Sequence, residues 1–199
     1  LLKRYMKREL PDEFITHMNN LNKGDTVIDL GANVGLVSEI LARKGLYVIA
    51  FEPNKTAFEE LKKVAKQYPN IEIHNVAAGT ENKHVKLFHH KDSEISDIDL
   101  TQSSSLLSEK PNVSIDLYDE VEEIDFAEFL NKRNLPIEIL KIDIEGFEID
   151  LINHLLDHNA VKDINKIYME THERKFPALE KSTEDLKLRI DSENYKDKF

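Results

Sequence analysis

An apolar run that leads into a glycine-rich turn constrains the fold of this chain more than any other feature. The run Thr26-Val-Ile-Asp-Leu30 is followed by Gly31-Ala-Asn-Val-Gly35 and then by a helix-like pattern. A second apolar run, residues 47–51, ends in Glu52, about 20 residues after the turn. A strand, turn and helix followed by a strand with an acid at its tip are typical of a pocket for a nucleoside-containing cofactor, whose ribose hydroxyls the acid binds.

The turn itself distinguishes between nucleoside cofactors. A dinucleotide-binding turn reads G-x-G-x-x-G, but counting from Gly31 the second glycine position holds Asn33 and the third holds Leu36. The pattern G-x-x-x-x-G-K-[ST] also fails, because no Lys-Ser/Thr pair follows Gly35. Asp29 would repel a pyrophosphate but suits a cationic amino group. S-adenosylmethionine, which has an ammonium, a sulfonium and a ribose but no phosphate, therefore fits better than NAD. The alternative is an ordinary turn whose glycines serve packing alone.

Composition sets the outer limits. The chain has 199 residues, enough for one domain with a sizeable core. Its formal charge of −11 argues against a nucleic-acid partner, because phosphate contacts need a basic face. There is no cysteine, and no apolar run reaches the ~20 residues of a membrane span, so we expect a cytoplasmic protein without a membrane span. Nothing in the composition predicts the oligomeric state.

Hydrophobic spacing predicts strands that alternate with helices. Further strand-like runs lie at residues 71–77, 139–144 and 166–170, with a hairpin strand at 85–88. Helix-like runs lie at 11–21, 34–41, 56–65, 126–130, 148–156 and 182–190. We expect a capping box at Thr56 and Glu59, and Ser182 or Thr183 as the cap of the last helix. Apolar strands separated by helices indicate an α/β fold, a mainly parallel sheet with helices on both faces.

We expect an N-terminal helical segment at residues 1–24 and a single domain at 25–199. The first residue, Leu1, is not methionine, which leaves open where the natural chain starts. Between Asp92 and Glu128 there are twelve Asp and Glu residues against one basic residue, Lys110. This acidic segment (about 92–128) predicts a solvated insertion, a flap that closes over the site and contacts substrate, or both.

Polar residues follow all five predicted strands of the sheet. Because ligands of parallel sheets bind beyond the carboxyl ends of the strands, these residues predict one site along that edge. The five tips carry residues 29–35, Glu52, residues 75–78, Asp143-Ile-Glu145-Gly146 and Glu170-Thr-His172.

Several of these segments resemble the FkbM family of S-adenosylmethionine-dependent methyltransferases. They are Val27-Ile-Asp-Leu-Gly-Ala-Asn-Val-Gly35, Phe51-Glu-Pro-Asn54, Val121–Leu130, Leu140-Lys-Ile-Asp-Ile-Glu-Gly-Phe-Glu148 and the serines of Ser103-Ser-Ser-Leu106. The resemblance covers about Asp25 to His172 and implies a Rossmann-like class I methyltransferase domain. It further implies methylation of a hydroxyl on a sugar, glycan precursor or secondary metabolite. Because only a helix and polar residues follow, the antiparallel hairpin that usually closes such a sheet is expected to be shortened or absent.

The candidate cofactor residues follow from the chemistry of S-adenosylmethionine. Asp29 would act on its ammonium directly or through water, Asn33 would contact it or support the turn, and Glu52 would accept hydrogen bonds from both ribose hydroxyls. The complete predicted cofactor set is Asp29, Gly31, Asn33, Gly35, Glu52, Pro53, Ala77, Ala78 and Asp143. In this set the glycines let the backbone approach the methionine part, and the two alanines leave room for a flat adenine.

An alcohol acceptor has to lose its proton, which requires a positioned base or a metal ion. Asp143 and His172 are the predicted catalytic residues, with His172 first because imidazole titrates nearest neutral pH; a structural role remains the alternative for each. Ser104, Glu145 and Glu170 are tentative substrate-binding residues.

A metal site is an alternative that we do not predict. Asp143, Glu145, Glu148, Glu170 and His172 offer ligands for Mg²⁺, with Lys141 able to neutralise one acid, and His89-His90 with Asp92 are a weaker set. Two other functions stay open. One is an NAD-dependent oxidoreductase on the same fold, and the other is a methyltransferase-like binding module without turnover.

Overall fold

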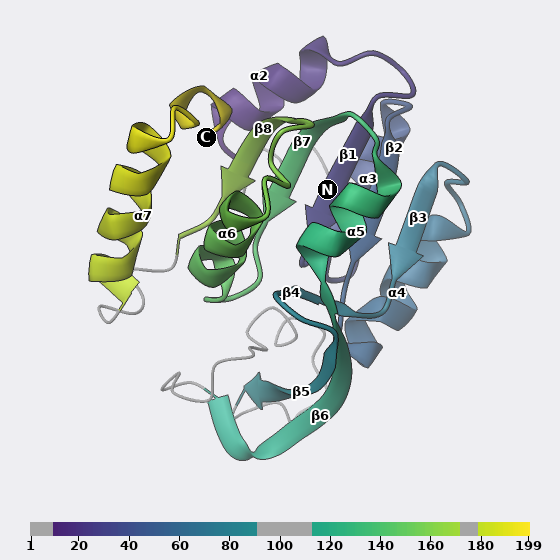
Figure 1. Cartoon of the computed structure of the whole chain (residues 1–199). Helices are drawn as coiled ribbons and strands as arrows, with labels where there is room; N and C mark the ends of the chain where they lie inside the picture. Colours follow the sequence, from purple (N-terminus) through teal and green to yellow (C-terminus); the bar gives the residue numbers. More distant parts are fainter. Residues whose placement is uncertain (1–9, 91–112, 172–178) are drawn as a thin grey trace.

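The central element is a five-stranded parallel sheet in the order β3-β2-β1-β7-β8 (Figure 1). The structure is a computed structural model that describes residues 10–90, 113–171 and 179–199. The five strands are β1 (Thr26–Leu30), β2 (Tyr47–Phe51), β3 (Ile71–His74), β7 (Ile137–Ile142) and β8 (Ile164–Met169). The order changes direction between β1 and β7, so a crevice is expected beyond their carboxyl ends.

Helices cover both faces of this sheet. One face packs against α2 (Asp12–Asn20), α3 (Leu36–Arg43) and α4 (Lys55–Ala65). The other packs against α5 (Phe126–Arg133), α6 (Glu148–Asp157) and α7 (Glu180–Ser192), with the short η3 (Lys196–Lys198) after them. The strands are buried on both faces, as Val27 and Ile28 illustrate at 0% and 1% exposure. The predicted α/β class with a Rossmann-like, mainly parallel sheet is confirmed.

A second, smaller sheet lies beyond the carboxyl ends of the five strands (Figure 1). It has the order β4-β6-β5 and consists of β4 (Ala77–Gly79), β5 (Lys83–His90) and β6 (Val113–Asp125). β6 pairs in parallel with β4 and antiparallel with β5, and a small apolar cluster of Ala77, Leu87 and Val121 lies within it. This sheet therefore stands at the edge where the site is expected.

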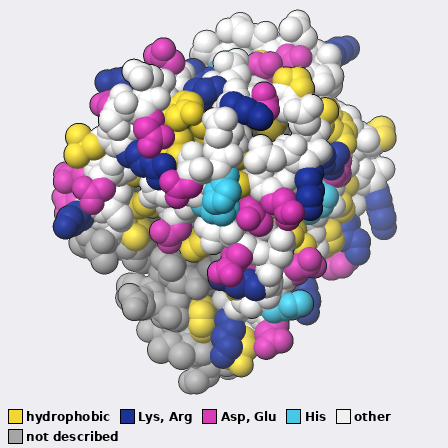
Figure 2. Space-filling model, viewed as in Figure 1, with side chains coloured by type: hydrophobic (Ala, Val, Ile, Leu, Met, Phe, Trp, Pro, Cys, Tyr) yellow, Lys and Arg dark blue, Asp and Glu magenta, His cyan; other side chains and the backbone are white. Residues whose placement is uncertain are grey.

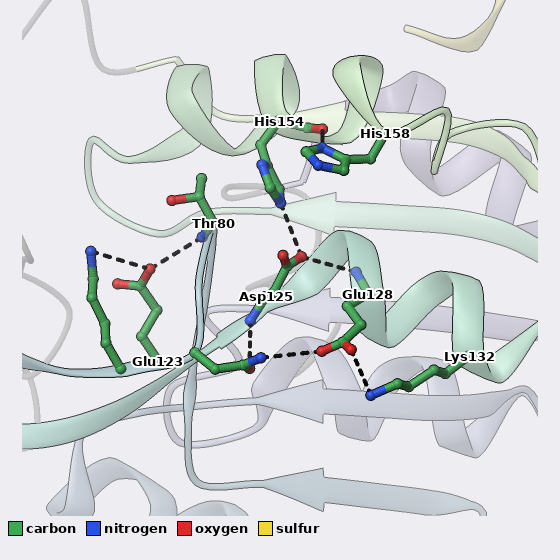
Figure 3. Close-up of polar contacts among 9 residues, drawn as sticks. Thr80, Glu123, Asp125, Glu128, Lys132, His154 and His158 are labelled. Carbon is green, nitrogen blue, oxygen red and sulfur yellow. Dashed lines mark hydrogen bonds and ion pairs between the residues drawn. The ribbon is translucent and has the colours of Figure 1, made fainter.

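Polar contacts join the small sheet to the helices of the main sheet (Figure 3). Asp125 ends β6, caps α5 through the Glu128 amide at 2.9 Å, and lies 2.9 Å from Nε2 of His154 on α6. The hydrogen bond to His154 and the one from the Glu128 amide lower the pKa of the Asp125 carboxyl, against the effect of its burial. Glu123, 2% exposed, accepts a hydrogen bond from the Thr80 amide at 3.1 Å. These contacts hold β6 beside α6.

The structure differs from the sequence prediction at several element boundaries. The predicted strand at 71–77 divides into β3 and β4, and part of the acidic segment forms the 13-residue β6, with residues 91–112 outside the described part. α4 is capped by Asn54, whose side chain accepts the Ala57 amide at 3.0 Å, and not by the predicted Thr56 box. α7 begins at Glu180. The hydroxyls predicted as its caps, those of Ser182 and Thr183, instead donate to the Leu179 carbonyl.

The ends of the described chain pack on the main sheet. On α2, which lies in the predicted N-terminal segment, the Phe14 ring lies 5.1 Å from the Tyr168 ring of β8, centroid to centroid. After β8 the described residues form α7 and η3, and they contain no strand beyond β8. Among the described residues, no helix has the length and apolar character needed to cross a membrane.

Candidate functional site

The turn after β1 depends on backbone conformations that glycine and asparagine adopt most readily. Gly31, Asn33 and Gly35 have positive φ angles of 75°, 49° and 87°. A Cβ added at Gly31 would lie 1.9 Å from the Asp143 carbonyl oxygen, and one added at Gly35 would lie 2.8 Å from Cδ1 of Leu61. Close packing within the protein therefore requires both glycines, Gly31 against the residue that follows β7 and Gly35 against α4.

The amide groups of this turn donate hydrogen bonds inside the protein. The Gly31 and Ala32 amides donate to the Phe51 carbonyl at 3.1 and 2.9 Å, and the Gly35 amide donates to the Ala32 carbonyl at 2.9 Å. The Asn33 amide donates to the acid that follows β2. Four amides of the turn are therefore engaged within the protein.

Glu52 follows β2 and is almost completely buried, at 7% exposure. Its Oε2 accepts the Asn33 amide at 2.8 Å and its Oε1 accepts the Asn54 amide at 2.7 Å. Burial raises the pKa of the Glu52 carboxyl to about 7, although both hydrogen bonds lower it. Asn75 fixes the neighbouring backbone, because its side-chain amide donates to the carbonyls of Glu52 and Pro53. Each carboxylate oxygen can accept more than one hydrogen bond, so Glu52 retains capacity for ribose hydroxyls.

Asp29 is fully buried near the end of β1. Its Oδ2 accepts the Ser38 hydroxyl at 2.7 Å. Its Oδ1 accepts no hydrogen bond from the residues that the structure describes, but it lies 3.1 Å from Nζ of Lys141, the residue opposite it on β7. The same ammonium lies 3.8 Å from Oδ2 of Asp143, whose side chain is 34% exposed. Lys141 thus connects the acid inside β1 with the acid beyond β7.

The chain beyond β7 forms a tight loop around Glu148. Glu145 and Gly146 have positive φ angles of 59° and 111°. The buried Glu148 accepts the Ile144 amide at 3.0 Å and the Gly146 amide at 2.9 and 3.0 Å. Glu148 therefore fixes the loop that carries Asp143 and Glu145.

The structure brings most of the predicted strand tips together, though not all. Asp29, Asn33, Glu52 and Asp143 share the edge formed by β1, β2 and β7, and Pro53 follows directly. Glu170 is exposed beyond the edge strand β8, where its amide donates to the Ile142 carbonyl at 3.0 Å. Ala77 and Ala78 lie in β4 and are each 4% exposed. Ser104 and His172, like Asp92, lie outside the described residues.

Comparison with known proteins adds an independent observation. The model of the methyltransferase FkbM domain matches residues 29–196. This chain belongs to the FkbM methyltransferase family. The predicted family is confirmed, and the match agrees with the prediction of a methyltransferase that uses S-adenosylmethionine.

Individual relatives are distant from this FkbM protein. Over 56 residues it is 34% identical to ribosomal RNA small subunit methyltransferase A of Alkaliphilus oremlandii, a match that covers 28% of this chain and only 20% of that relative. Precorrin 8w decarboxylase of Methanobacterium thermoautotrophicum is similar at 16% identity and a TM-score of 0.45, over 87% of this chain and 68% of that one. The N-terminal domain of human METTL16 with SAH gives 15% identity and a TM-score of 0.44, over 89% and 57%.

The donor set of this FkbM site fits S-adenosylmethionine. Four amides of the turn are engaged within the protein, and the charged side chains at the tips of β1, β2 and β7 are carboxylates with one Lys. Such a set suits a cofactor with cationic groups and a ribose. Contact of any single residue with the cofactor stays a prediction, and the buried Asp29 favours an indirect role there.

Metal ligation is not indicated by the described part of the chain. No group of three or more His, Asp or Glu side chains with metal-site geometry occurs among the described residues. Of the acids considered as Mg²⁺ ligands, Glu148 is engaged by two backbone amides. The side chains of His89 and His90 are not described.

Sequence reasoning missed the residues that hold the site in place. Ser38 supports Asp29 from α3, and Asn54 and Asn75 hold Glu52 and the backbone after it. Ser38 is a polar residue on an otherwise apolar helix face, which was a signal in the sequence. Asn54 binds residues two and three positions away, whereas Asn75 gave no such signal, because its partners come within reach only once β2 and β3 are paired.

Proposed function

We propose that this methyltransferase transfers the methyl group of S-adenosylmethionine to a hydroxyl of a sugar, glycan precursor or secondary metabolite. The observation that carries the proposal is the position of Asp143. Its amide donates to the Leu30 carbonyl at 3.1 Å, its carbonyl packs against Gly31, and a third of its side chain is exposed. A carboxylate is thus fixed beside the turn that we assign to the methyl donor.

The reaction requires a proton acceptor at this edge. Bound S-adenosylmethionine supplies an electrophilic methyl group, so transfer forms a carbon–oxygen bond and breaks the sulfur–carbon bond. The hydroxyl proton has to leave as the new bond forms. We assign this proton to the Asp143 carboxylate, with His172 as the second candidate. Glu145, Glu170 and Ser104 are proposed to bind the acceptor, since Glu145 follows β7 and Glu170 follows β8 at the same edge of the sheet.

The donor half of the site has separate tasks. Glu52 binds the ribose hydroxyls through the free lone pairs of its two oxygens, and Asn33 and Pro53 lie beside it. Asp29 acts through Ser38 and Lys141, because its carboxylate is fully buried. In-line methyl transfer gains much of its rate from alignment, which this rigid support provides.

Binding measurements test the donor assignment. Calorimetry with S-adenosylmethionine and NAD in parallel should give binding with the first and none with the second, because the carboxylates beside the turn would repel a pyrophosphate. Tight binding of NAD without S-adenosylmethionine binding would refute the proposal and favour the oxidoreductase alternative.

A methyl-transfer assay tests the acceptor class. Radiolabelled donor is offered to nucleotide sugars, glycans and small alcohols, with a ribosomal RNA fragment included because one relative carries that name. We expect methylation of a hydroxyl compound and not of the RNA. Asp143→Asn should reduce turnover on that compound by about 10²–10⁴-fold while S-adenosylmethionine still binds. Donor binding without methylation of any acceptor would favour the binding-module alternative.

A further inference from the structure

The tips of β1 and β7 hold two carboxylates and one ammonium in a short line. Lys141 Nζ lies 3.1 Å from Asp29 Oδ1 and 3.8 Å from Asp143 Oδ2. The Lys141 side chain is 12% exposed, between a fully buried acid and an acid exposed by a third. Charges in such a shielded position act on one another and on a neighbouring ligand more strongly than charges in open solvent.

The position of Lys141 is fixed by the sheet. Lys141 and Asp29 are opposite each other in the register of β1 and β7, and Asp143 lies two residues further, just beyond the end of β7. Ser38 donates to the other oxygen of Asp29 and anchors the group to α3. The Lys141 ammonium is therefore held beside Asp29, two residues before Gly31, and we place the methyl donor next to Gly31.

We propose that Lys141 is a specificity-determining residue that limits how strongly the donor site prefers cationic S-adenosylmethionine over its neutral product, S-adenosylhomocysteine. The inference rests on the proposed placement of the donor over the tip of β1.

The argument concerns the charge that the reaction removes. The donor carries one more positive charge than the product, at sulfur, and transfer discharges it. A donor site with carboxylates and no ammonium would bind cationic S-adenosylmethionine tightly. Binding that is stronger in the ground state than in the transition state slows the reaction. Because Lys141 offsets the charges of Asp29 and Asp143, the site loses less favourable interaction when the sulfur is discharged.

Binding constants of the two compounds test this directly, without any acceptor. Calorimetry gives the ratio of the dissociation constant of S-adenosylhomocysteine to that of S-adenosylmethionine. Lys141→Met should raise this ratio by about fivefold, and Asp29→Asn should lower it by a similar factor. Lys141→Arg keeps the charge and should leave the ratio unchanged even if both affinities fall.

A surface control and a folding check separate charge from structure. Lys63→Met removes an ammonium that pairs with Glu60 on the exposed side of α4, and it should not change the ratio. Circular dichroism establishes that each variant is folded. If Lys141→Met disrupts the sheet, Lys141→Arg and Asp29→Asn still test the effect of charge on the ratio. A ratio within twofold of wild type for folded Lys141→Met, or an equal change for Lys141→Arg, would overturn the inference. Failure of the wild-type protein to bind S-adenosylmethionine would instead overturn the proposed function, and this inference with it.

Discussion

At the scale of single residues, Gly31 carries two constraints that experiment can separate. Its φ of 75° disfavours any side chain, and a Cβ there would lie 1.9 Å from the Asp143 carbonyl oxygen. Gly24 has a φ of 89° but no atom within 4 Å of an added Cβ, so it is a matched control for the backbone strain alone.

We predict that Gly31→Ala lowers the free energy of unfolding by about 3 kcal/mol, since strain and overpacking add, and that it abolishes S-adenosylmethionine binding. Gly24→Ala should cost about 1 kcal/mol and leave binding intact. Urea denaturation and calorimetry measure the two effects. Equal losses of stability in both variants would show that the approach to Asp143 does not matter.

Glu52 predicts a pH dependence of stability with a definite sign. Because burial raises its pKa to about 7 in the folded protein, against an ordinary value of 4.5, the native state holds the proton longer than the unfolded chain. The Glu52 carboxyl therefore stabilises the folded protein at low pH. This stabilisation is lost as the pH rises from the pKa of Glu52 in the unfolded chain to its pKa in the folded protein.

We expect the difference in unfolding free energy between wild type and Glu52→Gln to fall by about 2.5 kcal/mol between about pH 5 and about pH 8. Gln cannot titrate, so subtraction of the variant removes the contributions that other groups share. Urea titrations at several pH values measure the difference. A difference that does not vary with pH would show that Glu52 is ionised over the whole range.

At the scale of elements, the start of α4 shows which of two candidate caps the fold uses. The sequence favours Thr56 with Glu59, yet the Asn54 side chain accepts the Ala57 amide. The cap lies two residues earlier because Asn54 directly follows the Glu52-Pro53 tip of β2, and its own amide donates to Glu52. The same residue thus begins the helix and supports the candidate ribose-binding acid.

We predict that Asn54→Ala costs about 1 kcal/mol of unfolding free energy and weakens S-adenosylmethionine binding, because it removes a helix cap beside Glu52. Thr56→Ala, at an exposed position with no side-chain hydrogen bond in the described structure, should change stability by less than about 0.5 kcal/mol. Thermal unfolding of both variants measures this. A larger effect at Thr56 than at Asn54 would restore the cap that the sequence predicted.

The division of the predicted strand at 71–77 has a local cause. Val76, Ala77 and Ala78 continue the apolar pattern of β3, so sequence spacing alone gives no reason to stop. In the structure Asn75 directs its side-chain amide to the carbonyls after β2, and the chain then leaves the main sheet to pair with β6. Pairing with a distant strand decided this boundary, and a pattern of neighbours could not show it.

At the scale of the whole molecule, charge is unevenly distributed along the chain, yet both signs are mixed on the face drawn in Figure 2. Figure 2 shows Asp, Glu, Lys and Arg side chains interspersed over the face that it presents. The net charge is −11, and the described candidate site contains carboxylates with one Lys. We therefore expect a neutral or weakly charged acceptor and not a polyanion.

Removal of divalent metal ions tests the mechanism of the whole enzyme. We predict that EDTA changes neither the melting temperature in the presence of S-adenosylmethionine nor methyl transfer to the acceptor, because we assign proton removal to a side chain. Ligand at about 100 times its dissociation constant should stabilise the protein by about 2.7 kcal/mol with or without EDTA. A loss of turnover that Mg²⁺ restores would contradict the assignment of a side-chain base.

The sequence by itself determined the layered α/β fold and predicted where the site lies. Continuous apolar runs and helical spacing follow from which faces must be buried, and β1 and β2 have the bounds that the apolar runs predicted. The residues at 29–35, 52 and 143 could be chosen because parallel strands end at one edge. Their residue types alone favoured S-adenosylmethionine over a dinucleotide.

Only the tertiary structure decided how those residues are held. Lys141 was a basic residue in an apolar run, with no acid assigned to it, until the register of β1 and β7 placed it opposite Asp29 and within 3.8 Å of Asp143. The acidic segment gave no strand signal, yet residues 113–125 form β6 through pairing with β4 and β5. Local sequence fixes burial and backbone preference over a few residues, whereas ion pairs and strand pairing join residues far apart along the chain. The strand-and-turn motif at residues 26–35 therefore predicted the cofactor, and the neighbouring strand revealed the charge that we propose tunes its binding.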